Sequence, residues 1–231
     1  MIKQIKKELR ALANPKKAKV LAGFFKTGKG EYGEGDVFLG IAVPETRKVA
    51  KKFTSLALSE IRELLHSPVH EERLTSLFIL INKYNKSSTA VKKDMFDFYI
   101  QNAKSLNNWD LVDLSAAKIA GNFLLDKDKA VLYRLAKSKS VWERRIAIIS
   151  TYEFIRNMQF DDTFKIAGLL LHDKHDLIHK AVGWMLREVG KRDQAAEEKF
   201  LKKHAMEMPR TALRYAIERF DEKSRHEYLK K

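Results

Sequence analysis

The tetrapeptide Arg144-Arg145-Ile146-Ala147 belongs to a pattern that recurs along the chain. Similar sequences occur at Glu72-Arg73-Leu74, His179-Lys180-Ala181-Val182 and Leu213-Arg214-Tyr215-Ala216. With Trp109 included, the equivalent positions are 73, 109, 145, 180 and 214, at intervals of 36, 36, 35 and 34 residues. A repeat of two helices at this period is typical of an α-solenoid, in which stacked helix pairs share one continuous core. We therefore predict an all-α fold and a single repeat domain over residues 1–231.

Apolar residues follow a helical period almost everywhere, and no segment shows a convincing strand alternation. The expected helices cover residues 2–12, 16–26, 43 onward, 58–66, 68–84, 88–103, 109–125, 127–137, 141–158, 162–172, 177–189, 194–206, 210–220 and 222–229. Asn14-Pro15 supplies an N-cap and a first helical residue for the second of these. The glycine-rich stretch 27–36 has neither a preceding strand nor a Gly-Lys-Ser/Thr ending, so a mobile loop between helices is expected rather than a phosphate-binding loop.

The composition indicates an anionic partner. Lys and Arg number 45 against 30 Asp and Glu, a formal net charge of +15 that is spread over nearly every segment. Nucleic acid is the commonest partner of such a surface, and an anionic membrane or a merely soluble basic protein is the alternative. The chain has no cysteine, which excludes disulfides and thiolate chemistry, and no apolar run long enough to span a bilayer. We expect a cytoplasmic, monomeric protein that lies on the nucleoid when bound to DNA.

Four of the five equivalent repeat positions are basic: Arg73, Arg145, Lys180 and Arg214. Equivalent positions of a solenoid line one face, so the sequence predicts a concave basic groove that follows a phosphate backbone. The alternative is that these residues form ion pairs between repeats, because several Glu residues lie near them in sequence.

The fifth position, Trp109, opens a different pattern. In a helix, Asp113 lies one turn further on the same face as Trp109. Trp142 with Arg145 and Trp184 with Arg187 repeat a Trp-x-x-Arg spacing in two later repeats. The alternative is that the tryptophans belong to the core, Asp110 is an acid of the first helical turn and Asp113 faces water.

These segments resemble a known family. The stretches 107–113, 142–147 and 180–188, together with Asn14-Pro15, Phe38-Leu39-Gly40-Ile41, Pro44 and Pro209-Arg210, look like those of the HEAT-like-repeat DNA alkylation repair glycosylases of the AlkD type. The resemblance covers almost the whole chain with order and spacing kept. No single motif is diagnostic, but the set is fairly specific.

The resemblance implies base excision repair: a monofunctional DNA glycosylase that removes cationic N3- and N7-alkylated purines from duplex DNA. By analogy, Asp113 would stabilise the developing oxocarbenium sugar and orient the attacking water. Trp109 and Trp184 would hold the lesion's deoxyribose and backbone, Arg145 would grip a phosphate, and Arg187 would support it. A cationic purine already leaves readily, so one carboxylate and electron-rich rings suit this chemistry without a general acid.

Two features depart from the family pattern. The aromatic residue expected on an N-terminal helix that enters the minor groove is represented by Phe24 or Phe25, and stretch 27–36 looks longer than usual. A non-catalytic DNA-binding relative that recognises bent or branched DNA therefore remains the alternative, and a protein-interaction scaffold is a third hypothesis. No cofactor and no metal site are expected, since Pro68 separates His66 from His70 and the other histidines lack ligand spacing.

Overall fold

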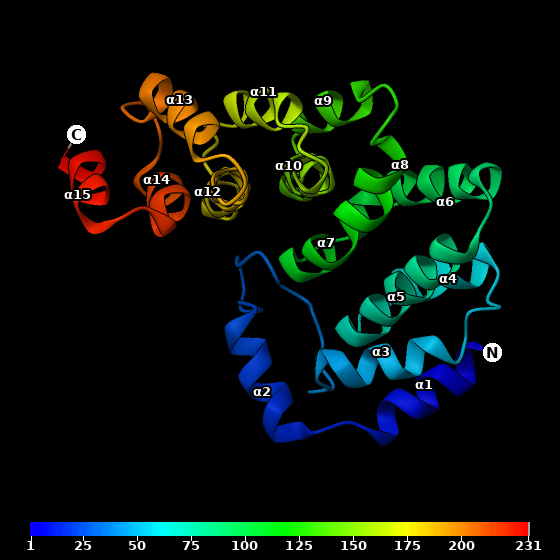
Figure 1. The fold of residues 1–231 in the computed structure, drawn as a ribbon. Helices are drawn as coiled ribbons and strands as arrows, with labels where there is room; N and C mark the ends of the chain where they lie inside the picture. The colour runs from blue at the N-terminus through cyan, green and yellow to red at the C-terminus, as the bar shows by residue number, and fades with distance from the viewer. Residues whose placement is uncertain (231) are drawn as a thin grey trace. The chain divides into compact units, whose positions relative to one another are not determined.

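The computed structural model describes residues 1–230, and over this range it confirms the all-α prediction (Figure 1). The elements are α1 (Ile2–Ala11), α2 (Pro15–Phe24), α3 (Val43–Lys51), α4 (Leu58–Leu65), α5 (His70–Lys86), α6 (Thr89–Gln101), η1 (Ala103–Ser105), α7 (Trp109–Ala116), η2 (Ala117–Gly121), α8 (Asn122–Leu124), α9 (Ala130–Ala136), α10 (Val141–Arg156), α11 (Asp161–Leu169), α12 (Asp176–Gly190), α13 (Gln194–His204), α14 (Arg210–Ala216), η3 (Ile217–Arg219) and α15 (Glu222–Lys230).

Two predicted helices are divided into parts, and the helix expected over 210–220 is α14 followed by the 3-10 segment η3. The expected helix over 109–125 consists of α7, then the π-helical segment η2, then α8. A π-turn inserts an extra residue into the helical ladder, and an apolar run such as this one shows no sequence signal for it. The remaining helices appear where they were expected, with ends that differ by a few residues, as is usual for helix boundaries.

The chain forms two compact units, Met1–Ser115 and Ala116–Lys231. In the first unit α5 packs against α3, α4 and α6, and α1 packs against α3 and α5. Ile5 and Leu9 of α1 are fully buried. The central position of α5 explains why most of its residues, polar ones included, are buried.

The second unit has two layers of helices, both visible in Figure 1. The second helices of the repeats, α10, α12 and α14, pack side by side, and α9, α11 and α13 form the other layer. Gly183 allows the close approach of α12 to α14, because a Cβ there would run into the carbonyl oxygen of Ala212. This arrangement is the stack of helix pairs that the period predicts.

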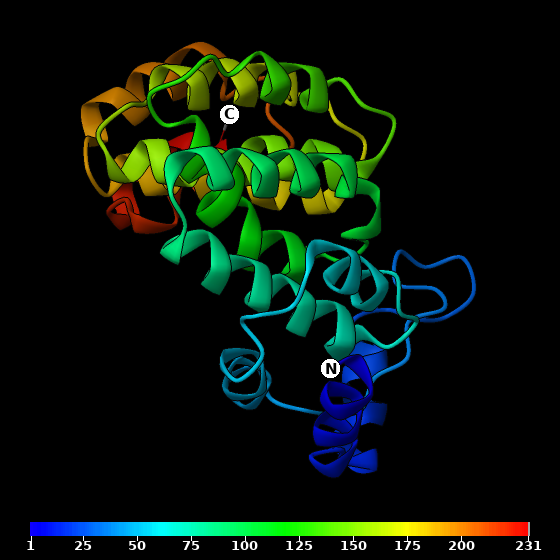
Figure 2. The ribbon, with the colours of Figure 1, turned by 90° about the vertical axis from the view of Figure 1, so that its right-hand side faces the viewer.

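The glycine-rich stretch is an irregular connection, drawn in blue in Figure 2. Its turns are held by local bonds, in which Gly28 and Gly30 donate their N–H groups to the carboxylates of Glu31 and Glu34. It ends at a single parallel bridge between Val37 and Val69. None of the described helices combines the length and the apolar character needed to cross a membrane.

Candidate nucleic-acid interface

The first two turns of α7 present the two residues expected at the site. The side-chain oxygen of Asn108 accepts a hydrogen bond from the Trp109 backbone N–H at 2.8 Å. The helix then continues through Ala116 without a break, so Trp109 and Asp113 share one face as predicted. Both residues are half-buried. A carboxylate and an indole are therefore presented together, one helical turn apart.

Trp109 is held by an aromatic cluster within the first unit. Phe25 stacks on its ring with the centroids 5.1 Å apart, and Phe24 meets it edge-on at 5.9 Å. On the far side of Phe25, the rings of Phe38 and His70 stack on each other at 4.5 Å. Phe25 is buried, whereas Phe24 is 63% exposed at the end of α2. The two aromatic residues singled out in the sequence thus differ in role, since Phe25 supports Trp109 and Phe24 faces solvent.

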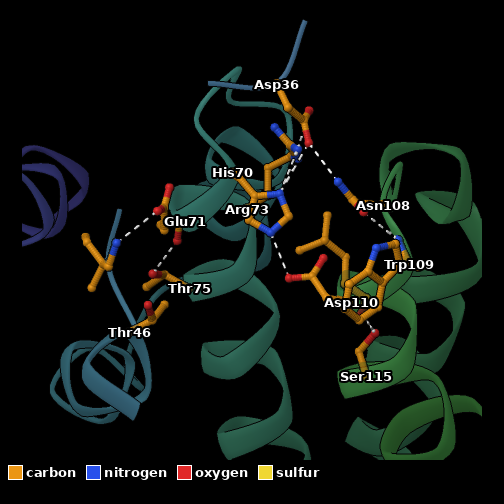
Figure 3. A network of polar contacts seen from close by, with 12 residues as sticks. Asp36, Thr46, His70, Glu71, Arg73, Thr75, Asn108, Trp109, Asp110 and Ser115 are labelled. Carbon is orange, nitrogen blue, oxygen red and sulfur yellow. Dashed lines mark hydrogen bonds and ion pairs between the residues drawn. The ribbon is translucent and has the colours of Figure 1, made fainter. Parts of the chain in front are cut away.

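A buried charged network fixes the start of α7 (Figure 3). The ring of His70 lies between two carboxylates, with its Nε2 2.8 Å from Asp110 and its Nδ1 3.3 Å from Asp36. Arg73 donates to Asp36 at 2.6 Å, and Asn108 donates to the same carboxylate at 3.1 Å. The network therefore joins the end of the glycine-rich loop, the first turn of α5 and the first turn of α7.

The protonation of this network follows from its contacts. Burial alone would lower the pKa of His70, but the hydrogen bonds to Asp110 and Asp36 raise it above its usual value. Burial alone would raise the pKa of Asp36, but the contacts with His70, Arg73 and Asn108 lower it. The two carboxylates therefore favour the imidazolium form of His70, and the cations around Asp36 favour its carboxylate form.

A second buried carboxylate holds the segment that precedes α3. Glu71 accepts backbone N–H bonds from Leu39 at 2.9 Å, Gly40 at 2.8 Å and Ile41 at 3.2 Å. Leu39 in turn accepts the N–H of Asn14, whose side chain caps α2. Through these bonds, Glu71 of α5 fixes the position of α2 and of the aromatic residues at its end.

A cavity of about 360 Å³ opens beside the network, with a mainly apolar wall. Its lining comes from α2, the 38–43 segment, α5 and α7, and it includes Lys17, Phe24, Phe25, Phe38, His70, Glu71 and Asp110. The described residues contain no group of three or more His, Cys, Asp or Glu side chains arranged to hold a metal ion.

The second unit contains the remaining candidates. Trp184 is half-buried on α12, and its indole N–H donates to Glu188 at 3.3 Å. Arg187, one turn on, pairs with Glu218, which is itself half exposed. Arg214 on α14 is exposed and forms no ion pair within residues 1–230. Trp142 is buried in the core, as the alternative interpretation of the tryptophans expected.

Three of the four basic repeat positions make contacts within the protein. Arg73 pairs with Asp36, Arg145 donates to the carbonyl oxygen of Leu177, and Lys180 pairs with Asp176 on the same helix at 2.7 Å. Arg73 and Arg145 are only 3% and 4% exposed. Their predicted contacts with phosphates stay predictions, and we leave both residues out of the DNA contacts proposed below because both side chains are buried and bonded within the protein.

Sequence reasoning missed three members of the charged network: Asp36, His70 and Asp110. The interpretation that placed Asp110 in the first turn of its helix was right about position but did not foresee its burial. One signal was available for Asp36, since it lies 37 residues before Arg73, close to one repeat period. The short interval between His70 and Arg73, one helical turn, also put an imidazole beside a guanidinium.

The fold and the site together define a helical-repeat protein with aromatic and basic groups on the second helices of its repeats. The family model described as DNA alkylation repair enzyme matches residues 5–220, and the chain belongs to this family. The membership supports a role in the repair of alkylated DNA, with DNA as the substrate. A solved structure titled "Predicted DNA alkylation repair enzyme from Enterococcus faecalis" is similar with a TM-score of 0.70 and 18% identity, covering 91% of this chain and 97% of that chain. A comparison with curated proteins finds no match.

Proposed function

We propose that the protein is a monofunctional DNA glycosylase that excises N3- and N7-alkylated purines from duplex DNA. The observation that supports this most directly is the pairing of Trp109 and Asp113 on one face of α7, with the indole supported from behind by Phe25. Membership of an alkylation repair family gives the class of lesion, and the net charge of +15 suits a DNA partner.

The chemistry needs few groups. Alkylation at N3 or N7 leaves the purine with a positive charge, so the base departs as a neutral molecule without protonation by a general acid. As the glycosidic bond lengthens, positive charge grows on the sugar, and a carboxylate about 4 Å away at an effective dielectric near 20 would contribute about 4 kcal/mol. In our proposal Asp113 supplies this carboxylate and also orients the water that attacks the anomeric carbon.

The aromatic and basic groups would bind the substrate rather than react with it. We assign ring contacts with the deoxyribose and backbone to Trp109 and Trp184, and a contact at the duplex surface to the exposed Phe24. Cation–π attraction to a ring contributes about 0.5–2 kcal/mol, depending on desolvation. Arg187, Lys180 and Arg214 supply phosphate contacts in the second unit, each adding salt-dependent affinity.

The test is release of N7-methylguanine from methylated duplex DNA by wild type, Asp113→Asn and the control Asp94→Asn, which changes an exposed carboxylate on α6. We expect wild type and the control to release base equally and Asp113→Asn to be slower by about 100-fold or more, with unchanged DNA affinity.

If no variant releases base while all bind duplex DNA, the glycosylase proposal is wrong and the protein is a non-catalytic relative. If Asp113→Asn retains full activity, another group supplies the charge and the assignment of Asp113 fails.

A further inference from the structure

We propose that His70 is a positioning residue for base excision: its doubly hydrogen-bonded imidazolium fixes the start of α7 and thereby the orientation of Trp109 and Asp113. The inference rests on the proposed function but goes beyond it, because it adds a residue that touches neither DNA nor the reacting atoms. It also predicts that excision fails when the imidazolium loses its proton.

The geometry leaves His70 a single productive state. Both ring nitrogens face carboxylates, Nε2 toward Asp110 at 2.8 Å and Nδ1 toward Asp36 at 3.3 Å. Ionised carboxylates only accept hydrogen bonds, so both nitrogens must donate, and only the protonated ring has two N–H groups. A neutral ring would lose one of these two bonds: either Asp110 loses its only side-chain donor among the described residues, or Asp36 keeps Arg73 and Asn108 alone.

Because the network is buried, losing one of these hydrogen bonds costs free energy. The side chains of His70 and Asp36 are each 3% exposed and that of Asp110 is 9% exposed, so water cannot readily replace a missing donor. One oxygen of Asp110 is already buried without a hydrogen-bond partner among the described residues. Among the described residues, His70 is therefore the only hydrogen-bond partner of the Asp110 carboxylate, and releasing this contact would free the first turn of α7.

Two connections lead from His70 to the reacting face of α7. Asp110 directly follows Trp109 in the chain, and Asp113 lies one turn beyond, so a rotation of the first turn moves both side chains. The second connection runs through aromatic rings. The ring of His70 stacks on Phe38 and lies with its centroid 5.2 Å from that of Phe25, and Phe25 stacks on Trp109. Asn108, which binds the Trp109 N–H, also donates to Asp36.

The other charged groups near the ring do not supply an alternative partner. Arg73 approaches Nδ1 at 3.5 Å but is committed to Asp36 and to the carbonyl of Ser67. Lys17 of α2 and Glu71 of α5 line the adjoining cavity, and Glu71 is occupied by three backbone N–H groups. The hydrogen bonds to Asp110 and Asp36 raise the pKa of His70 against the effect of burial, so the imidazolium is held to a higher pH than in a free histidine and is lost as the pH rises.

The first experiment measures single-turnover excision of N7-methylguanine against pH for wild type and His70→Gln, with uncatalysed release subtracted. Gln donates through one nitrogen and cannot serve both carboxylates. We expect the wild-type rate to fall as the pH rises above neutrality. We expect His70→Gln to be slower by about tenfold at neutral pH, with no such pH dependence, while circular dichroism and DNA affinity stay unchanged.

Three further variants make the readout specific. Asp110→Asn keeps a hydrogen-bond acceptor but removes its charge, so the wild-type fall in rate should move to lower pH; it also replaces His70→Gln if that variant does not fold. His66→Gln changes an exposed histidine four residues away and should behave as wild type. Glu197→Gln removes a carboxyl of the second unit whose pKa is raised to about 8, and it should leave the pH profile of excision in place.

A second readout does not require excision. In a Trp142→Phe, Trp184→Phe background, Trp109 is the sole tryptophan, and its emission should shift with the same pH midpoint as the ring protons of His70 observed by NMR. The shift should disappear in His70→Gln.

The proposal is overturned if His70→Gln has the wild-type pH profile, or loses activity only in proportion to the unfolded fraction. If wild type releases no base, the proposed function fails, and the emission experiment alone then decides whether His70 positions Trp109. An emission that does not follow the titration of His70 overturns the positioning role.

Discussion

The first turns of α5 and α12 have related sequences, but the first is buried and the second is exposed to solvent. In α5, the four charged or titratable residues from His70 to Arg73 are at most 3% exposed. In α12, the side chains of Asp176 and Lys180 are 56% and 40% exposed and pair with each other along the helix. The repeated sequence therefore specifies a helix at both places. Its charged residues are buried and structural in α5 but exposed to solvent in α12.

The cause of the difference is the chain that covers the start of each helix. The glycine-rich loop ends at Asp36, and the following residues pair with Val69 and bring their N–H groups to Glu71. The start of α5 is thus covered by chain that carries its own charge and donors. At the start of α12, Asp176 and Lys180 pair with each other, and Asp173 of the connection from α11 binds Arg144. A buried charge in the repeat is tolerated where the connection supplies its partner.

The largest effect is expected from breaking the buried ion pair of α5. Arg73→Met leaves Asp36 in a buried position without its guanidinium partner, and we expect the free energy of unfolding to fall by about 3–5 kcal/mol. The matched variant Lys180→Met removes an exposed pair between residues four apart on one helix, and a loss of about 0.5 kcal/mol or less is expected. Urea unfolding of both variants measures the difference.

Equal losses in the two variants would contradict the comparison, because they would mean that burial does not distinguish the repeat positions. Arg73→Lys serves as the control for charge, since it keeps the cation but loses the second contact with the Ser67 carbonyl.

The second unit has its own buried carboxyl group, Glu197. Glu197 is 1% exposed, one of its oxygens has no hydrogen-bond partner among the described residues, and burial, with a smaller effect of Glu198, raises the pKa of its carboxyl to about 8. Because the folded pKa lies above the unfolded one, the stabilisation is complete below about pH 4.5 and is lost as the pH rises to about 8. We expect the wild type to lose about 2–4 kcal/mol of stability between pH 5 and pH 8.

Glu197→Gln should remove most of this slope, and thermal or urea unfolding at several pH values measures it. Glu198→Gln changes the half-buried neighbouring carboxylate, is the matched control and should keep most of the slope. A wild-type protein whose second unit is equally stable at both pH values would show that Glu197 is ionised throughout.

The sequence predicted the fold from its period, because each equivalent position falls in the second helix of a pair. It also placed Trp109 and Asp113 on one face, which needs only helical geometry. It could not predict that Asp36, His70 and Asp110 form one network, since their contacts join segments 34 and 40 residues apart through a loop without periodicity. Local spacing determines which face a residue occupies, but burial depends on what covers that face.

One glycine in each unit gives a further comparison, because Gly40 is closely packed and Gly168 is not. Gly40 has a φ of +83°, and a Cβ there would run into the carbonyl oxygen of Asn14. Gly40→Ala should therefore destabilise the protein by about 1–3 kcal/mol. Gly168 lies within α11 with no atom within 4 Å of an added Cβ, so Gly168→Ala should stabilise it by about 0.5–1 kcal/mol. Opposite signs in thermal unfolding support the close packing at Gly40, and a neutral Gly40→Ala would contradict it.

The smallest effect concerns the basic residues that remain at the surface. Arg214 is exposed on α14, in the layer of second helices, and Arg214→Ala should leave stability unchanged while reducing the salt dependence of duplex binding by about 0.9 in the slope of log K against log salt. Lys202→Ala removes an exposed charge from α13 in the other layer and should leave the slope as in wild type, because a residue outside the interface releases no counterions on binding. Titrations of the three proteins at several salt concentrations give the slopes. If Lys202→Ala and Arg214→Ala reduce the salt dependence equally, DNA binding depends on the net charge of the protein and not on the layer of second helices. The phosphate contacts proposed for Arg187, Lys180 and Arg214 would then be wrong.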